Sequence, residues 1–220
     1  MILAAGRGTR LAQWTVHTPK PLVPVRGVPV IERTLWRLAA LGFSHVVINV
    51  HHLGDKLRAA LGDGSRFGLE LHWSVETELL ETGGGVRQAL PLLGREPVFI
   101  INGDILWAVD VTPLLAGFQR ESMDMLLALV PPPQGQGDFL CDAAGRLTRA
   151  PSAPGAWTYA GLQVLDPRCL EPCPLAPFSL NRVFDQSARQ GRLFGHPLSG
   201  PWMDMGSPEQ LATAERTWVW

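Results

Sequence analysis

Short apolar runs mark three places in the first half of the chain. The run "HVVINV" at 45–50 is rich in β-branched residues, "LELHW" at 69–73 alternates in polarity, and "PVFII" at 97–101 is continuously apolar. Alternation is typical of a half-buried strand, and a continuous apolar run is typical of a strand covered on both faces. The pattern therefore predicts three strands, the third of them central in a sheet.

Between these runs, apolar residues recur at helical spacing. Ile31, Leu35 and Leu38 share one face of a predicted helix that Gly42 ends, and a second such pattern closes at Gly62. Strands that alternate with helices predict an α/β fold. We expect a Rossmann-like three-layer α/β/α sandwich with a mostly parallel, mixed central sheet, whose ligands lie at the carboxyl ends of its strands.

The second half of the chain is less regular. "MDMLLALV" at 123–130 predicts a strand, "PPPQGQGDF" at 131–139 a loop, and "DAAG" at 142–145 a turn. Residues 180–190 predict a helix, and a capping box at Ser207 predicts the start of the last one. We expect antiparallel additions to the sheet in this half.

The composition favours one globular domain. The chain has 220 residues, of which 46% are hydrophobic and 18% charged, with no linker long enough to divide it. We therefore expect a single domain over 1–220. A net charge of -1 argues against nucleic acid or a membrane as a partner, and no apolar run reaches membrane-spanning length. These features predict a cytoplasmic protein.

The cysteines and the terminal tryptophans do not indicate a catalytic or metal site. Three cysteines are too few for a disulfide framework, which fits a reducing compartment. Cys169 and Cys173 have no second Cys/His pair beside them, so we interpret them as small apolar side chains rather than metal ligands. Trp218 and Trp220 either dock back on the fold or contact another copy, which leaves a homo-oligomer open.

The opening stretch "MILAAGRGTRLAQWTVHTPKPLVPV" combines backbone freedom with positive charge. Gly6 and Gly8 allow backbone N–H groups to converge on an anion. Arg10 lies on the same loop, and Lys20 stands between two prolines, where we expect a stiff extended backbone. A P-loop does not fit, because it needs a Gly-Lys-Ser/Thr ending, and a dinucleotide fingerprint does not fit, because Leu11 replaces the third glycine. We predict a phosphate-binding loop; an ordinary turn with solvated charges is the alternative.

Two distant carboxylates suggest a metal. "VFIINGD" places Asn102 and Asp104 after the central strand, and Asp204 lies in "GPWMDMG". A carboxylate about 4 Å from a phosphate charge would oppose binding by about 4 kcal/mol at an effective dielectric of 20, so a bridging cation is needed. Oxygen ligands favour Mg2+. Turn residues are the alternative. His51 and His52 are a weaker metal pair, because neighbours on an extended chain point to opposite sides.

"LAAGRGTRL" followed by "TPKPLVPV" resembles the signature of the sugar-1-phosphate nucleotidyltransferases, also called nucleotide-sugar pyrophosphorylases. The resemblance spans almost the whole chain and implies a nucleoside triphosphate and a sugar-1-phosphate as substrates. It implies Mg2+ as cofactor, held between Asp104 and Asp204. The implied catalytic residues are Arg10, Lys20, Asp104 and Asp204. The implied nucleotide-binding residues are Leu3, Ala5, Gly6, Arg7, Gly8, Thr9, Arg10, Lys20, Gly83 and Asn102.

Other segments resemble one branch of that family. "LETGGG", preceded by "LGDGSRFGL", resembles the small single-domain uridylyltransferases that act on N-acetylmuramate-1-phosphate in peptidoglycan recycling, which implies UTP. We expect the three glycines to precede a helix. The resemblance implies that Gly83 contacts the base and ribose of the nucleotide. "GQGDF" and "TYAGLQVL" resemble the segments beside the sugar, which implies that Asp138, Tyr159 and Gly161 bind it.

The chain also departs from this family pattern. No lysine follows Lys56, whereas many relatives hold the sugar phosphate with a lysine; Arg149 is a candidate substitute. Mannose-1-phosphate guanylyltransferase is an alternative activity, because the phosphate loop looks the same in both groups. A non-catalytic nucleotide-binding regulatory subunit is an alternative of another class. Such a subunit would lack the metal-binding aspartates or the lysine of the phosphate loop, whereas Lys20, Asp104 and Asp204 are all present here.

Overall fold

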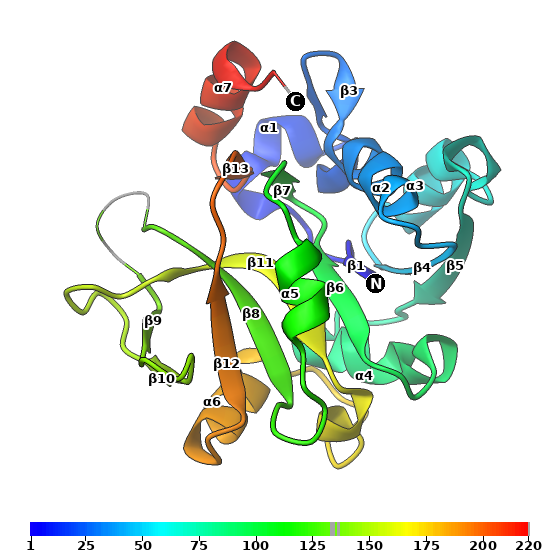
Figure 1. Ribbon diagram of the computed structural model, residues 1–220. Helices are drawn as coiled ribbons and strands as arrows, with labels where there is room; N and C mark the ends of the chain where they lie inside the picture. Colours follow the sequence, from blue (N-terminus) through cyan, green and yellow to red (C-terminus); the bar gives the residue numbers. More distant parts are fainter. Residues whose placement is uncertain (133–134, 136, 220) are drawn as a thin grey trace.

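A mixed sheet of seven strands, in the order β12-β8-β11-β6-β1-β4-β5, forms the centre of the molecule (Figure 1). The computed structural model describes residues 1–132, 135 and 137–219. Neighbouring strands are parallel except where β11 pairs with β6 and β8. The strands are β1 (Ile2–Leu3), β4 (His45–Val50), β5 (Glu70–Val75), β6 (Val98–Asn102), β8 (Met125–Val130), β11 (Thr158–Leu165) and β12 (Leu193–Pro197). The predicted mostly parallel, mixed sheet is confirmed.

Helices cover both faces of this sheet and complete a three-layer sandwich, as predicted. One apolar cluster joins the sheet to α2 (Val30–Ala40), α3 (Gly54–Leu61) and α5 (Thr112–Gly117). A second cluster joins the opposite face to α4 (Glu81–Leu93) and α6 (Asn181–Arg189). Because odd and even residues of a strand point to opposite faces, Ile48 belongs to the first cluster and Val47 to the second.

Smaller elements surround the sheet. The predicted turn at 142–145 joins β9 (Phe139–Cys141) and β10 (Leu147–Arg149) into an antiparallel hairpin. The remaining pairs are β2 (Pro24–Val25) with β3 (Val28–Pro29) and β7 (Ile105–Trp107) with β13 (Trp202–Asp204). α1 (Ala12–Thr15) is short, and α7 (Pro208–Thr217) begins after Ser207, which accepts a hydrogen bond from the N–H of Gln210.

Two predictions concern the terminal tryptophans and the internal loop at 131–139. Trp218 is buried and packs with Leu211 and Met205, so this tryptophan docks back on the fold. Trp220 and part of the predicted loop at 131–139 lie outside the described residues. Within residues 1–132, 135 and 137–219, no helix combines the length and the apolar character needed to cross a membrane.

The position of the three glycines at 83–85 differs from the prediction. They were expected to precede a helix, but α4 begins at Glu81 and contains all three. The physical reason is close packing: a Cβ on Gly84 would lie 2.5 Å from the carbonyl oxygen of Ala176. The glycines let the segment around 176–178 lie directly against the helix backbone.

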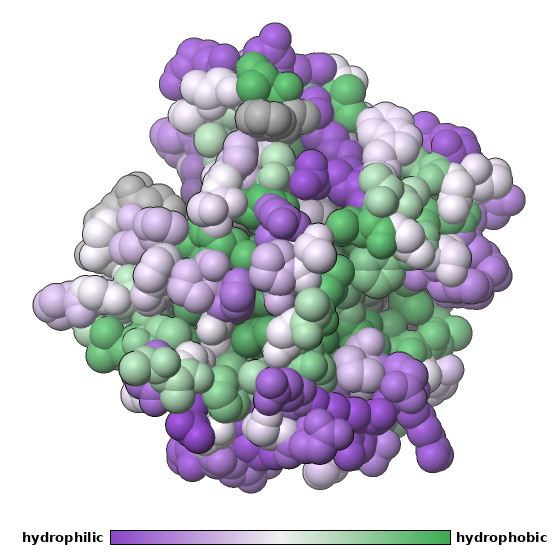
Figure 2. All heavy atoms as spheres, in the orientation of Figure 1, coloured by the Kyte–Doolittle hydropathy of each residue, from purple (hydrophilic) through white to green (hydrophobic). Residues whose placement is uncertain are grey.

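Ion pairs gather at the end of the sheet where β8 begins, and Figure 2 shows hydrophilic side chains along this lower edge of the molecule. Asp166 is 3% exposed and accepts hydrogen bonds from Arg120 Nε at 2.8 Å and Arg168 Nε at 2.9 Å. Burial alone would raise the pKa of Asp166, but Arg168 and Arg120 lower it below its usual value. This carboxylate therefore stabilises the fold in its ionised form.

Asp166→Asn is expected to lower the free energy of unfolding by about 3 kcal/mol near neutral pH, because it leaves two guanidinium groups without their buried partner. A lowered pKa in the folded state gives stability that is present above the unfolded pKa and is lost as pH falls through the folded one. The difference from wild type should therefore shrink in acid. Urea unfolding at two pH values measures it, with the exposed Asp55→Asn as the control.

Candidate active site

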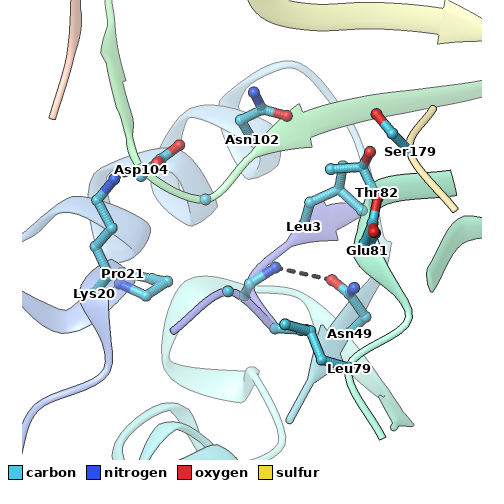
Figure 3. Close-up of a pocket in the computed structure, with 14 residues that line it drawn as sticks. Leu3, Lys20, Pro21, Asn49, Leu79, Glu81, Thr82, Asn102, Asp104 and Ser179 are labelled. Carbon is cyan, nitrogen blue, oxygen red and sulfur yellow. Dashed lines mark hydrogen bonds and ion pairs between the residues drawn. The ribbon is translucent and has the colours of Figure 1, made fainter. Parts of the chain in front are cut away.

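A cavity of about 400 Å3 opens at the carboxyl ends of β1, β4 and β6 (Figure 3). Its lining consists of Leu3, Ala4, Ala5, Gly6, Lys20, Pro21, Asn49, Leu79, Glu81, Thr82, Asn102, Gly103, Asp104 and Ser179. The topology places it where a doubly wound sheet presents its ligand site. Of the residues predicted to bind a nucleotide, the structure brings Leu3, Ala5, Gly6, Lys20 and Asn102 to this cavity.

The loop after β1 is tightly packed around Gly8, whereas the backbone at Gly6 has free space beside it. Gly8 has a φ of +64°, and its carbonyl oxygen accepts hydrogen bonds from Leu11 N at 2.9 Å and Thr15 Oγ1 at 3.0 Å. A Cβ on Gly8 would lie 2.9 Å from Thr15 Cγ2 and 3.1 Å from Lys20 Cβ. Around Gly6 no atom lies within 4 Å of such a Cβ, so the backbone there faces open space.

Lys20 lies at one side of this cavity. The prediction of an extended backbone at Lys20 is wrong, because the residue begins a short 3-10 helix, Lys20–Leu22, in which Pro21 occupies a first-turn position that needs no N–H. Its ammonium group forms an ion pair with Asp104, and Figure 3 shows the Lys20 side chain pointing toward that carboxylate. The side chains of Lys20 and Asp104 are 10% and 28% exposed, so the charge of the pair is partly shielded from water.

The second carboxylate reaches the same place through a strand pair. Asp204 lies opposite Ile105 in the β7–β13 ribbon, and Met205 N donates to the carbonyl oxygen of Asp104 at 2.9 Å. Burial and the neighbouring Asp104 raise the pKa of Asp204, while Lys20 and Arg10 oppose the rise. Two adjacent carboxylates with one raised pKa form a site that favours a cation.

Arg10 completes the cluster. It is an exposed residue, but its guanidinium passes over Gly206: a Cβ there would lie 2.8 Å from both Arg10 Nη1 and Asp204 Oδ2. The absence of a side chain at Gly206 therefore lets Arg10 approach Asp204. The four residues predicted to be catalytic lie together, but of these only Lys20 and Asp104 line the cavity. Arg10 and Asp204 are not part of its lining, and neither are Arg7, Gly8 and Thr9.

A buried polar network missed by the sequence prediction supports this cavity. Asn49 Oδ1 accepts a hydrogen bond from Ala4 N at 2.8 Å, and Asn49 Nδ2 donates to Glu76 Oε1 at 2.7 Å. Glu76 Oε2 in turn accepts from Leu80 N at 3.0 Å. Asn49 and Glu76 are 2% and 3% exposed. The network therefore ties the loop after β1 to the segment before α4, both of which contribute residues to the cavity lining.

Asn49→Ala is expected to lower the free energy of unfolding by about 2 kcal/mol, since it leaves Ala4 N and Glu76 Oε1 buried without their partner. Thermal and urea unfolding measure this effect. The exposed Asn181→Ala is the matched control and should change stability by less than about 0.5 kcal/mol. Equal stability of the two variants would contradict a structural role for the network.

The structure does not bring Gly83 to the cavity. Its N–H donates to the carbonyl oxygen of Phe178 at 2.9 Å, and a Cβ there would lie 2.2 Å from the Phe178 ring. The preceding residues Glu81 and Thr82 line the cavity instead. Glu81 has a φ of +58°, a left-handed conformation that is uncommon for a side chain other than glycine.

The residues predicted to bind the sugar lie in two different places. Gly161 has a φ of +75° and lies directly against Asn102: a Cβ at this position would be 3.0 Å from Asn102 Nδ2. Asp138 instead accepts a hydrogen bond from Tyr159 N at 3.0 Å where the register of β11 shifts, and the Tyr159 ring packs on Phe184. Burial raises the pKa of Tyr159. Asp138 and Tyr159 are not part of the cavity lining.

Three other predictions concern Arg149, the pair His51 and His52, and the cysteines. Arg149, considered as a substitute for the missing lysine, donates through Nε to Asp185 Oδ1 at 2.6 Å. His51 Nδ1 lies 3.0 Å from the carbonyl oxygen of Glu76, and among the described residues no group of three metal-ligating side chains includes His51 or His52. The three cysteines, all in the described part of the chain, are free thiols.

A family model for nucleotidyl transferases matches residues 1–137. The chain is 38% identical to N-acetylmuramate alpha-1-phosphate uridylyltransferase of Neisseria meningitidis serogroup B, over 98% of this chain and 96% of that protein. The protein of the same name from Caulobacter vibrioides is 35% identical, over 98% and 94%. Mannose-1-phosphate guanylyltransferase of Mycobacterium tuberculosis is 31% identical, over 96% of this chain but 62% of that protein.

The fold is also similar to that of a crystal structure from Bacillus anthracis, described as a glucose-1-phosphate thymidylyltransferase and solved in complex with sucrose. The TM-score is 0.84, and the match covers 98% of this chain and 92% of that one. The sequence identity is 22%, so this likeness concerns the fold.

Proposed function

Because the chain belongs to the nucleotidyl transferase family and is a sugar-1-phosphate nucleotidyltransferase, we propose that it transfers a uridylyl group from UTP to N-acetylmuramate-1-phosphate. The products are a UDP-sugar and pyrophosphate. Residues 1–220 would act as one catalytic domain in the cytoplasm, on a sugar phosphate supplied by peptidoglycan recycling.

The observation that carries the proposal is the cluster of Lys20, Asp104, Asp204 and Arg10 at the carboxyl ends of the central strands. A triphosphate needs positive groups, and net charge does not supply them here. In this cluster two cationic side chains flank two carboxylates, beside a glycine loop whose backbone faces open space. Phosphoryl chemistry depends on such positioning of charge rather than on a nucleophilic side chain.

The reaction is a single in-line displacement. An oxygen of the sugar phosphate forms a bond to the α-phosphorus of UTP, and the bond from that phosphorus to the oxygen bridging to the β-phosphate breaks. Pyrophosphate leaves with the electron pair. Lys20 would stabilise negative charge at the α-phosphate, and Arg10 would hold the departing pyrophosphate. The N–H groups near Gly6 would contact phosphate oxygens.

A divalent cation fits the donor set. Members of this family generally use a divalent metal, and Asp104 with Asp204 offers hard oxygen ligands next to each other. Burial, and after it the neighbouring Asp104, raise the pKa of Asp204, so its charged form is disfavoured without a cation. We propose that these two residues hold Mg2+, which would neutralise charge on the phosphate groups of UTP.

The choice of UTP and of the sugar rests on the relatives. Both N-acetylmuramate alpha-1-phosphate uridylyltransferases match along nearly the whole of both chains. The guanylyltransferase match leaves more than a third of that protein uncovered. Guanylyl transfer to mannose-1-phosphate is the second candidate, because that relative is also 31% identical over 96% of this chain.

Pyrophosphate release over a grid of four nucleoside triphosphates and several sugar-1-phosphates tests the proposal. UTP with N-acetylmuramate-1-phosphate should give a kcat/KM about 100-fold above the other pairs, since a site built for one base and one acid group leaves polar groups unpaired with the wrong ones. A maximum with GTP and mannose-1-phosphate would instead establish the second candidate. Binding of UTP with Mg2+ but no turnover on any sugar would indicate a regulatory subunit.

A further inference from the structure

A group of metal-ligating side chains lies far from the cavity, at the amino ends of β4 and β5. His45 Nε2 is 3.1 Å from Glu70 Oε2, and His72 Nε2 is 3.3 Å from Glu70 Oε1. One ligand atom from each of the three residues lies within 4.8 Å of the other two. The candidate active site is at the opposite, carboxyl ends of the same strands, so this group plays no part in the proposed transfer reaction.

The register of two strands holds the group together. His45 is paired with Glu70, and Val47 with His72, so the three side chains lie on the face of the sheet that α4 covers. The intervening Val46 and Leu71 point to the other face and are buried in its core. A shift by one residue would expose that core, so burial fixes the positions of the three ligands.

The spacing of the ligand atoms suits a tetrahedral ion. Zinc binds nitrogen and carboxylate oxygen at about 2.0–2.2 Å, so two ligands in a tetrahedral site are about 3.3 Å apart. His45 Nε2 lies 3.1 Å from Oε2 of Glu70 and His72 Nε2 lies 3.3 Å from Oε1, so each imidazole is near that spacing from one of the two carboxylate oxygens. The exposed side chains of His45 and Glu70 can adjust further without disturbing the core.

The surroundings of the group also favour a cation. His45 Nδ1 lies 2.8 Å from Ser44 Oγ, a contact that leaves Nε2 directed at Glu70, as is usual where a second hydrogen bond orients a metal-bound imidazole. His45 and His72 line a cavity of about 270 Å3 together with Leu92 and Leu93, in the last turn of α4. The carboxyl end of a helix carries partial negative charge.

We propose that His45, Glu70 and His72 bind one divalent transition-metal ion of the zinc class, with water as the remaining ligand. Imidazole nitrogen selects such ions over Mg2+, which prefers oxygen. The ion would link the edge strand β5 to β4 and stabilise this side of the sheet.

Isothermal titration of the purified protein with Zn2+ near neutral pH tests the site. The titration is carried out on Asp104→Asn, so that Asp104 and Asp204 do not contribute a second site. One equivalent should bind. His45→Gln, His72→Gln and Glu70→Gln, each added to that background, should weaken binding by at least about tenfold. Because the three side chains lie at the surface, these variants are expected to fold, and circular dichroism checks that they do.

Two controls make the result specific. His52→Gln changes an exposed histidine outside the group and should leave Zn2+ affinity unchanged. An excess of Mg2+ should not displace the ion, and acidification should release it as the imidazoles become protonated. If the Asp104→Asn parent binds no Zn2+, or if the three variants bind it as tightly as that parent, the group is only a set of hydrogen bonds and the proposal fails.

Discussion

Asp204→Asn is expected to reduce Mg2+-dependent pyrophosphate release by about 10³-fold, because metal coordination to a transferring phosphate is worth several kcal/mol. Asp104→Asn should have a similar effect. The loss should persist at saturating UTP and sugar phosphate, since it concerns the charge that develops during the reaction. The exposed Asp55→Asn is the control and should retain full activity.

Stability measurements separate this effect from misfolding. The β7–β13 pairing is made by backbone groups and does not depend on the Asp204 carboxylate. The pKa of Asp204 is raised by burial and by Asp104, so near neutral pH its charge opposes folding of the metal-free protein. The asparagine variant should therefore be at least as stable as wild type without metal. An inactive Asp204→Asn that is also unfolded would leave its role untested, and Asp104→Asn would then decide; full activity in both would contradict the metal site.

Lys20→Met is expected to lower kcat by about 10²- to 10³-fold, the usual effect of removing one preorganised group that stabilises developing charge. Lys20 is nearly enclosed and pairs with Asp104 at the edge of the cavity, so water replaces its charge poorly. Initial rates at saturating Mg2+ and UTP measure the effect. Saturation matters because removal of the lysine also frees Asp104 to bind the metal more tightly.

The chain offers a matched control for this substitution. Lys56 is its only other lysine, and its ammonium donates to the carbonyl oxygen of His17 at the surface. Lys56→Met should therefore retain wild-type kcat. Lys20→Arg should recover little activity, because a planar guanidinium does not reproduce a compact ammonium charge. Equal rates in Lys20→Met and Lys56→Met would remove Lys20 from the reaction.

Hydrophobic pattern alone predicted the sheet because burial imposes that pattern. The six residues of "HVVINV" became β4, with five of the six buried between helices of both layers. The sequence pattern also placed Asp104 correctly, since a carboxylate after a central strand must emerge at the carboxyl edge. Asp204 is different. Asp104 lies 100 residues earlier in the sequence, and the pairing of β7 with β13 brings the two carboxylates together, which only the family resemblance anticipated.

Other features could not be predicted, because they depend on contacts between distant segments. The glycines at 83–85 look like a ligand loop in sequence, but they serve the packing of α4 against Phe178 and its neighbours. Asn49 was visible only as one polar residue in an apolar strand. Its buried partner Glu76 lies just after the next strand, and a single sequence does not reveal that they meet. Lys20 turned inward through a 3-10 turn that flanking prolines do not specify.

The central claim is that an oxygen of the sugar phosphate attacks the α-phosphorus of UTP. The most direct test follows radioactive phosphorus from UTP through the reaction of the wild-type protein with Mg2+ and N-acetylmuramate-1-phosphate. Label at the α-position should appear wholly in the UDP-sugar, and label at the γ-position wholly in pyrophosphate. Label from the α-position in free UMP or UDP, or from the γ-position in orthophosphate or in the sugar product, would contradict uridylyl transfer.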